Sequence, residues 1–141
     1  MHSVVANFKK MVFPLLNIST KKWNSEDINN YIIFDKFIYT DKESIFNELY
    51  KNKLFIDCNG QIFKAIRKEE LTDKWRNWLR FIPNIWKCEI HFKTTGENWT
   101  VNQLRNYLLE RISDLKPTKH TEKWKSDLMN AKNYTELIYG K

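Results

Sequence analysis

The chain has few glycines and prolines, which form turns and linkers, and few cysteines, which form disulfides. Its 141 residues include only three Gly, three Pro and two Cys. Linkers are rich in Gly, Pro and Ser, and this sequence has no such stretch, no internal repeat and no segment of low complexity. We therefore expect residues 1–141 to form a single domain.

The two cysteines, Cys58 and Cys88, provide neither a disulfide framework nor a metal-binding pattern. Those patterns need several cysteines, or Cys and His at short fixed spacings. Free Cys is usually buried as a small hydrophobe. We expect both thiols to lie in the core.

Long apolar runs are also missing. No stretch reaches the roughly 18 apolar residues that a membrane-spanning helix needs. The first residues, 1–16, have Lys9 and Lys10 in their middle and no small-residue cleavage site, which is not the pattern of a secretory signal. We expect a soluble, cytoplasmic protein that does not contact a membrane.

The chain is instead rich in aromatic and basic residues. Nine Phe, six Tyr and six Trp, with 42% hydrophobic residues overall, exclude a disordered chain. The 24 basic and 17 acidic side chains give a net charge of +7. The excess is spread along the sequence, with +4 in residues 64–94 from eight basic and four acidic side chains. Such a protein favours acidic partners, either phosphate backbones or acidic protein surfaces.

A β-hairpin is the strongest local prediction, over residues 54–66. Two runs of strand-forming residues flank Asn59 and Gly60, and Asn-Gly tolerates the positive φ angles of a type I′ turn. A two-residue loop would pair Ile56 with Phe63, and we expect their shared face to enter the core.

A third strand is predicted at about residues 86–94, ending before Gly96. Apolar and polar residues alternate strictly along it. In a strand, successive side chains point to opposite faces. We expect the core face to carry Trp86, Cys88, Ile90 and Phe92, and the solvent face to carry Lys87, Glu89, His91 and Lys93.

Several helices are predicted around these strands. Capping-box patterns begin at Thr40 and Thr100, where a Thr hydroxyl and a Glu or Gln three residues later can exchange hydrogen bonds with the helix backbone. The first should start a helix over residues 41–51 that buries Ile45, Phe46 and Leu49. The second should start a helix reaching about residue 115, with an apolar stripe of Val101, Leu104, Leu108 and Ile112 and with Arg105, Glu110 and Arg111 off that stripe.

Weaker helical patterns occupy residues 3–13, 72–83, 122–129 and 134–139, and residues 31–37 are typical of a strand. Together these elements predict an α+β fold: one antiparallel sheet, built around the hairpin and the third strand, packed with several helices.

No catalytic motif is recognisable. The chain has no glycine-rich phosphate loop, nucleophile elbow or zinc-binding helix. Its three histidines, His2, His91 and His120, are isolated, and only His91 has a neighbouring carboxylate on the same predicted face, that of Glu89. We expect no enzymatic activity, no cofactor and no metal.

Residues 74–87 combine four cations, three Trp and one Phe with no acidic residue. Aromatic rings between cations suit single-stranded nucleic acid, because bases stack on the rings and phosphates meet the charges. The same residues suit a hydrophobic core with Arg stems lying over it, or the anchor of a protein interface, where Trp and Arg are enriched. Trp78 and Trp86 fit inward positions of the flanking helix and strand, which favours the core for those two rings. The sequence does not separate nucleic-acid binding from a protein interface.

The order of these features resembles small bacterial immunity proteins that accompany polymorphic toxins, including contact-dependent growth inhibition systems. The resemblance covers roughly residues 40–115: the helix, the Asn-Gly hairpin with Phe63, the run 78–83, the alternating strand and the Leu104/Leu108 helix. It implies a non-enzymatic α+β domain that binds a cognate toxin domain, commonly a nuclease, and blocks it. Many such proteins are acidic; this chain is basic, which implies either an acidic surface on the toxin or binding away from the toxin's nucleic-acid groove.

Our leading hypothesis is therefore an immunity-type protein that neutralises a protein toxin, and the alternative is a single-stranded nucleic-acid-binding protein that uses residues 74–87. A subunit of a homo-oligomer is a third possibility. The aromatic anchors would provide buried area and the charges would set orientation and association rate. The predicted contact residues are Trp75, Arg76, Arg80, Lys87, Glu89 and His91.

Overall fold

The computed structural model describes residues 10–39, 43–70 and 87–139. Its elements, in chain order, are β1 (Leu15–Asn17), the 3-10 helix η1 (Ile28–Tyr31), β2 (Ile32–Ile33), β3 (Phe37–Tyr39), α2 (Glu43–Leu49), β4 (Leu54–Ile56), β5 (Gln61–Glu70), β6 (Lys87–Asn98), α4 (Val101–Ile112), α5 (Lys119–Asn130) and α6 (Tyr134–Tyr139).

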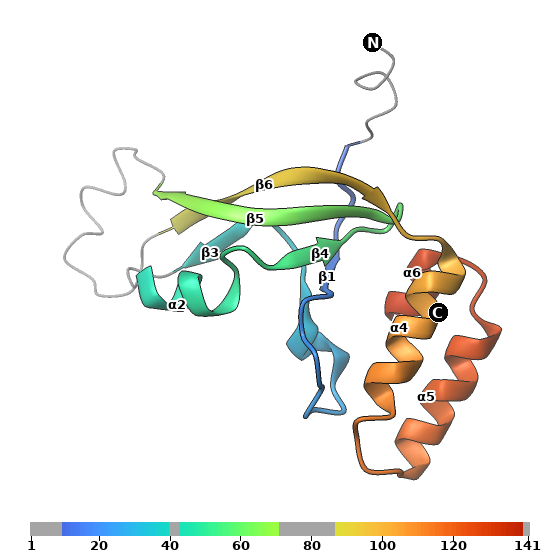
Figure 1. Ribbon diagram of the computed structural model, residues 1–141. Helices are drawn as coiled ribbons and strands as arrows, with labels where there is room; N and C mark the ends of the chain where they lie inside the picture. The colour runs from blue at the N-terminus through green and yellow to red at the C-terminus, as the bar shows by residue number, and fades with distance from the viewer. Residues whose placement is uncertain (1–9, 40–42, 71–86, 140–141) are drawn as a thin grey trace.

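Within these residues the strands form one antiparallel six-stranded sheet, in the order β2-β1-β4-β5-β6-β3. Helices α4, α5 and α6 gather at one end of the sheet and α2 lies at the other, as Figure 1 shows. The predicted α+β class with a central antiparallel sheet is confirmed.

The core is divided between the two faces of the sheet. Leu15 and Leu16 are adjacent on β1, and Phe55 and Ile56 are adjacent on β4. Adjacent residues of a strand point to opposite faces, so one residue of each pair lies on each face of the sheet. Leu16 and Ile56 pack in one cluster with residues of α4, α5 and α6. Leu15 and Phe55 pack in a second cluster with Phe46 of α2. The sheet is therefore covered by different helices on its two faces.

Helix α4 follows its prediction closely. The Thr100 hydroxyl accepts from the Gln103 backbone N–H at 3.1 Å, and the Gln103 side chain accepts from the Thr100 N–H at 2.8 Å. The predicted stripe is buried at Leu104, Leu108 and Ile112. The helix ends at Ile112, before the predicted end near residue 115.

The predicted register of the hairpin is wrong by one residue. Phe55 pairs with Phe63 and Ile56 with Ile62, which leaves a three-residue loop of Cys58, Asn59 and Gly60. Ile56 and Phe63 therefore point to opposite faces of the sheet. Both are buried, because each face is covered.

The buried carboxylate of Asp57 explains the longer loop. Its Oδ1 accepts from the backbone N–H groups of Asn59 and Gln61, at 2.9 Å each, and its Oδ2 accepts from the Val12 N–H at 3.0 Å. An Asp that bonds the backbone two residues further on forms its own turn. This turn, with Gly60 at φ +83°, replaces the expected type I′ turn.

The third strand is present and has the predicted alternation. Cys88 and Ile90 are buried, whereas Lys93 is exposed. The strand continues past the predicted end, through Gly96, to Asn98. Among the thiols, Cys88 is fully buried as expected, but Cys58 is only half-buried.

Other predictions differ in detail. Residues 10–13, the described end of the predicted first helix, are not helical. The strand predicted at 31–37 is two strands, β2 and β3, which form the opposite edges of the sheet. Leu49 is 51% exposed instead of buried. The Thr40 capping box, the predicted helix at 72–83 and Trp86 lie outside the described residues.

The two weaker predictions near the C-terminus are confirmed as α5 and α6. None of the helices in the described part of the chain is long and apolar enough to cross a membrane.

Candidate functional site

Six polar side chains of β5 and β6 share one face of the sheet. The Cα partners are Lys64 with Lys93, Arg67 with His91, and Glu69 with Glu89. Directly paired residues point to the same side, and the three residues on β6 are two apart, so they also share a side. We call this set the charged face: Lys64, Arg67, Glu69, Glu89, His91 and Lys93.

A β-bulge makes this alignment possible. The register shifts between Ala65 and Arg67, which leaves Ile66 as an extra residue on β5. Without the shift, Lys64 and Arg67 would point to opposite faces, because they are three residues apart. The bulge therefore places the cations of β5 on the same side as Lys93.

Both carboxylates of the charged face are engaged by neighbouring groups. Glu89 forms an ion pair with Lys36 at 2.9 Å, and His91 Nε2 lies 2.7 Å from Glu69 Oε1. The hydrogen bond from Lys36 lowers the pKa of the Glu89 carboxyl. The carboxylate in contact with His91 is thus that of Glu69, across the strand pair, and not that of Glu89 on the same strand.

Three cations of the charged face remain without a carboxylate partner among the described residues: Lys64, Arg67 and Lys93. All three are exposed. Lys64 and Lys93 are directly opposite each other, an arrangement that destabilises a sheet through like-charge repulsion. Among the described residues, these three cations are not neutralised by a carboxylate.

The predicted contact residues are only partly placed by the structure. Glu89 and His91 lie together on the charged face, as expected, and are partly buried. The backbone of Lys87 begins β6 and pairs with Tyr39. Trp75, Arg76 and Arg80 lie outside the described residues. Sequence reasoning missed Lys64 and Arg67, because their side depends on the register and on the bulge.

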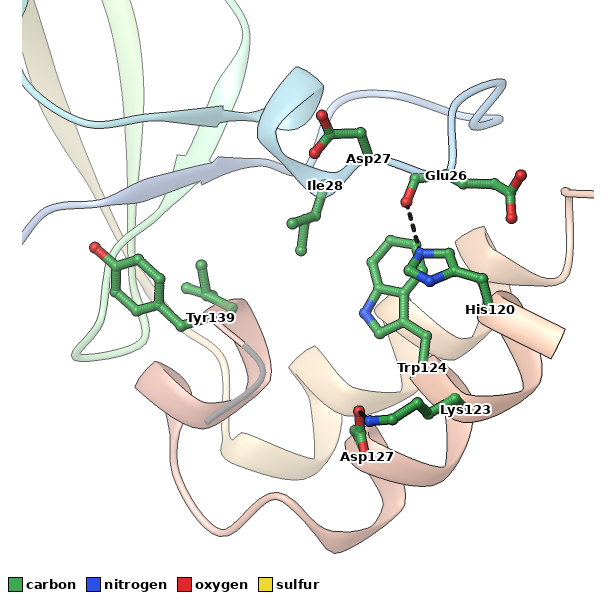
Figure 2. Close-up of a pocket in the computed structure, with 9 residues that line it drawn as sticks. Glu26, Asp27, Ile28, His120, Lys123, Trp124, Asp127 and Tyr139 are labelled. Carbon is green, nitrogen blue, oxygen red and sulfur yellow. Dashed lines mark hydrogen bonds and ion pairs between the residues drawn. The ribbon is translucent and has the colours of Figure 1, made fainter.

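A second feature is a pocket beside the helices. It has a volume of about 760 Å³ and lies between the segment around η1 and the helices α5 and α6. Figure 2 shows Trp124 and Tyr139 on its two sides, Ile28 above and the Lys123–Asp127 ion pair below. The remaining lining residues are Glu26, Asp27, His120 and Ile138.

The polar groups of the pocket are held in place by local contacts. Lys123 Nζ and Asp127 Oδ2 are 3.1 Å apart on α5. The His120 Nε2–H donates to the Glu26 carbonyl at 3.3 Å. Sequence reasoning missed this pocket, since it joins residues that are about a hundred positions apart and share no motif.

Metal-ligating side chains do not gather in the part of the chain that the structure describes: no group of three or more His, Cys, Asp or Glu could hold an ion there. No protein-family model, curated protein or solved structure matches this chain.

Proposed function

We propose that this protein is a non-enzymatic, cytoplasmic immunity-type protein that binds and neutralises a toxin domain through its charged face. The observation that carries the proposal is the pairing of Lys64 with Lys93, next to Arg67, on an exposed strand pair. The repulsion between paired lysines costs stability. An acidic partner would relieve that cost when it binds.

The carboxylates of the same face favour a protein partner over a nucleic acid. Glu69 and Glu89 lie beside Lys64, Arg67 and Lys93 and would repel a phosphate backbone. A protein partner can place basic side chains against the carboxylates of the charged face and acidic side chains against its cations. Such complementary charges set the orientation and the association rate of a complex.

The resemblance to immunity proteins gives the partner its class, and the net charge of +7 gives its expected sign. An acidic patch on the toxin domain, near or away from its active site, would meet the charged face. Trp75, Arg76 and Arg80 remain predicted contacts, because the chain between β5 and β6 includes them.

The proposed immunity function is tested with the product of the neighbouring gene. We expect the gene directly upstream to encode a large exported protein with a C-terminal toxin domain, and we expect the present chain to protect bacteria that express that domain. The combined substitution Lys64→Glu, Arg67→Glu and Lys93→Glu should weaken binding of the purified domain at least about 100-fold, as truncation or reversal of several interface charges does. The affinity is measured by titration calorimetry and protection by colony counts.

A matched control carries the same number of charge reversals elsewhere: Lys116→Glu, Lys119→Glu and Lys132→Glu, all exposed and away from β5 and β6. This variant should retain protection and affinity. Equal loss in both variants, or no protection by the natural chain, would contradict the proposal.

The nucleic-acid alternative predicts a different result. A mobility-shift assay with generic single-stranded RNA and DNA over a salt series should give no complex near physiological salt if the partner is a protein. Tight binding whose affinity falls steeply with salt would instead support the nucleic-acid function.

A further inference from the structure

The pocket beside α5 and α6 has preformed apolar walls. The Trp124 ring packs on the buried ring of Trp23, with ring centroids 5.7 Å apart, and Trp23 is stacked in turn on Tyr31 at 4.3 Å. Ile28 and Ile138 complete the apolar lining. Because a stack of three rings holds Trp124, this wall is in place before any ligand arrives.

The indole nitrogen of Trp124 points into the open space between Trp124 and Tyr139 in Figure 2. Within the described residues this N–H has no hydrogen-bond acceptor. The NMR resonance of this indole N–H should therefore shift when a molecule enters the pocket.

The rim of the pocket is acidic, although the chain as a whole is basic. Three acidic residues, Glu26, Asp27 and Asp127, and one lysine, Lys123, line it. Figure 2 shows the Glu26 carboxylate extending away from the space between Trp124 and Tyr139. Only Asp127 is paired with the Lys123 ammonium. Glu26 and Asp27 accept from uncharged donors, the Thr118 hydroxyl and the Asn29 backbone N–H, at 2.9 Å each. Both carboxylates therefore accept a hydrogen bond, but neither forms an ion pair within the described residues.

We propose that this pocket binds a small organic cation, an amine or guanidine carried on a flat apolar body. The body would lie against Trp124, Ile28 and Ile138, and the charge would lie at the carboxylates of the rim. The volume of about 760 Å³ is in the range of small-molecule sites, about 300–1,000 Å³, which favours a free ligand over a protein side chain. The pocket uses no residue of β5 or β6, so this proposal is independent of the proposed function.

Three probes of nearly equal shape test the charge preference: phenethylamine, phenethyl alcohol and hydrocinnamate. Each is titrated into the protein in low-salt buffer, and the indole N–H resonance of Trp124 is followed by NMR. The resonance is assigned with Trp124→Phe. We expect the amine to bind roughly threefold or more tightly than the alcohol, and the carboxylate to bind least, because charges a few ångströms apart at a wet surface still interact.

Two ion pairs on α5 allow variants that line the pocket to be compared with control variants that do not. Lys123 and Asp127 line the pocket, whereas Glu122 and Lys125 form an ion pair on the same helix that does not. Lys123→Gln removes the cation of the rim and should tighten amine binding roughly two- to fivefold, and Asp127→Asn should weaken it by a similar factor. Lys125→Gln and Glu122→Gln should change the affinity far less.

Folding of each variant is checked by circular dichroism. The proposal is overturned if the alcohol binds as tightly as the amine, if the Trp124 resonance does not move with any probe, or if the control variants change amine affinity as much as the pocket variants do.

Discussion

Two glycines have left-handed backbone conformations in this structure, and their surroundings differ. Gly60 has φ +83° and Gly96 has φ +80°. A Cβ on Gly60 would lie 2.5 Å from the Trp99 carbonyl oxygen and 2.6 Å from the Tyr134 hydroxyl, whereas a Cβ on Gly96 would meet no atom within 4 Å. The Tyr134 hydroxyl also donates to that carbonyl at 2.7 Å, so the groups around Gly60 are fixed.

This difference leads to a prediction for two alanine substitutions. Gly96→Ala should lower the free energy of unfolding by about 1–2 kcal/mol, the cost of left-handed backbone for an L-residue. Gly60→Ala adds a clash with backbone and should cost about 3 kcal/mol or more. Urea denaturation measures both. Equal losses would mean that the packing against Gly60 is not as close as described.

Arg111 shows why single residues are hard to place from sequence. It lies off the apolar stripe of α4, where a solvated side chain is expected, yet it is only 9% exposed. Its guanidinium donates to the Lys21 carbonyl and forms ion pairs with Glu110 at 2.8 Å and Asp114 at 3.2 Å. The Asp114 carboxylate in turn accepts from the backbone N–H of Trp23 at 3.1 Å. The loop that covers Arg111 is remote in sequence, so local periodicity could not reveal it.

At the scale of elements, the hairpin of β4 and β5 is set by one side chain. Asp57 is fully buried and accepts hydrogen bonds from the backbone N–H of Asn59 inside the loop and of Gln61 directly after it. It also accepts from Val12, which joins the segment before β1 to the hairpin. The Asp57 carboxylate therefore fixes both the loop length and the register.

Replacement of this carboxylate should destabilise the whole protein. Asp57→Ala leaves buried N–H donors without an acceptor, and we expect a loss of about 2–4 kcal/mol in the free energy of unfolding. Asp35 is a suitable control, because it accepts from the Phe37 N–H at 2.6 Å in a similar local turn but is exposed. Asp35→Ala should cost at most about 1 kcal/mol. A small loss for Asp57→Ala, measured in urea, would contradict this role.

At the scale of the whole molecule, the sheet separates two cores. Ile90 belongs to the cluster with Phe46, and Leu108 and Ile112 belong to the cluster of α4, α5 and α6. The two clusters have no residue in common. Substitutions in different clusters should then act independently, as distant sites without shared partners do.

The test is a pair of double-mutant cycles. Leu108→Ala should cost about 2–5 kcal/mol, and Ile90→Val and Ile112→Val about 0.5–1.5 kcal/mol each. Leu108→Ala and Ile90→Val should add within about 0.5 kcal/mol. Leu108→Ala and Ile112→Val, one helical turn apart, should deviate from additivity. Strong coupling across the sheet would show that the two faces do not behave as separate cores.

The charged face and the pocket also occupy different parts of the molecule. The first is formed by β5 and β6 and the second by the η1 segment with α5 and α6. A partner on the charged face and a ligand in the pocket could therefore bind together, without a shared contact residue.

The sequence alone determined the features that depend on neighbours along the chain. The α4 capping box, its Leu104/Leu108 stripe and the alternation along β6 all follow from short periodic patterns. Helical and strand periodicity, and hydrogen bonds between residues three apart, need no knowledge of the rest of the fold.

Only the tertiary structure decided the features that join distant segments. The hairpin register depends on Asp57, whose carboxylate accepts a hydrogen bond from the distant Val12 backbone N–H. The side on which Arg67 lies depends on a bulge in β5. The pocket needs residues near 26 and near 124 to meet. A single shift of pairing reverses the direction of every following side chain. The fold class is therefore readable from local pattern, whereas the charged face and the pocket are set by long-range packing.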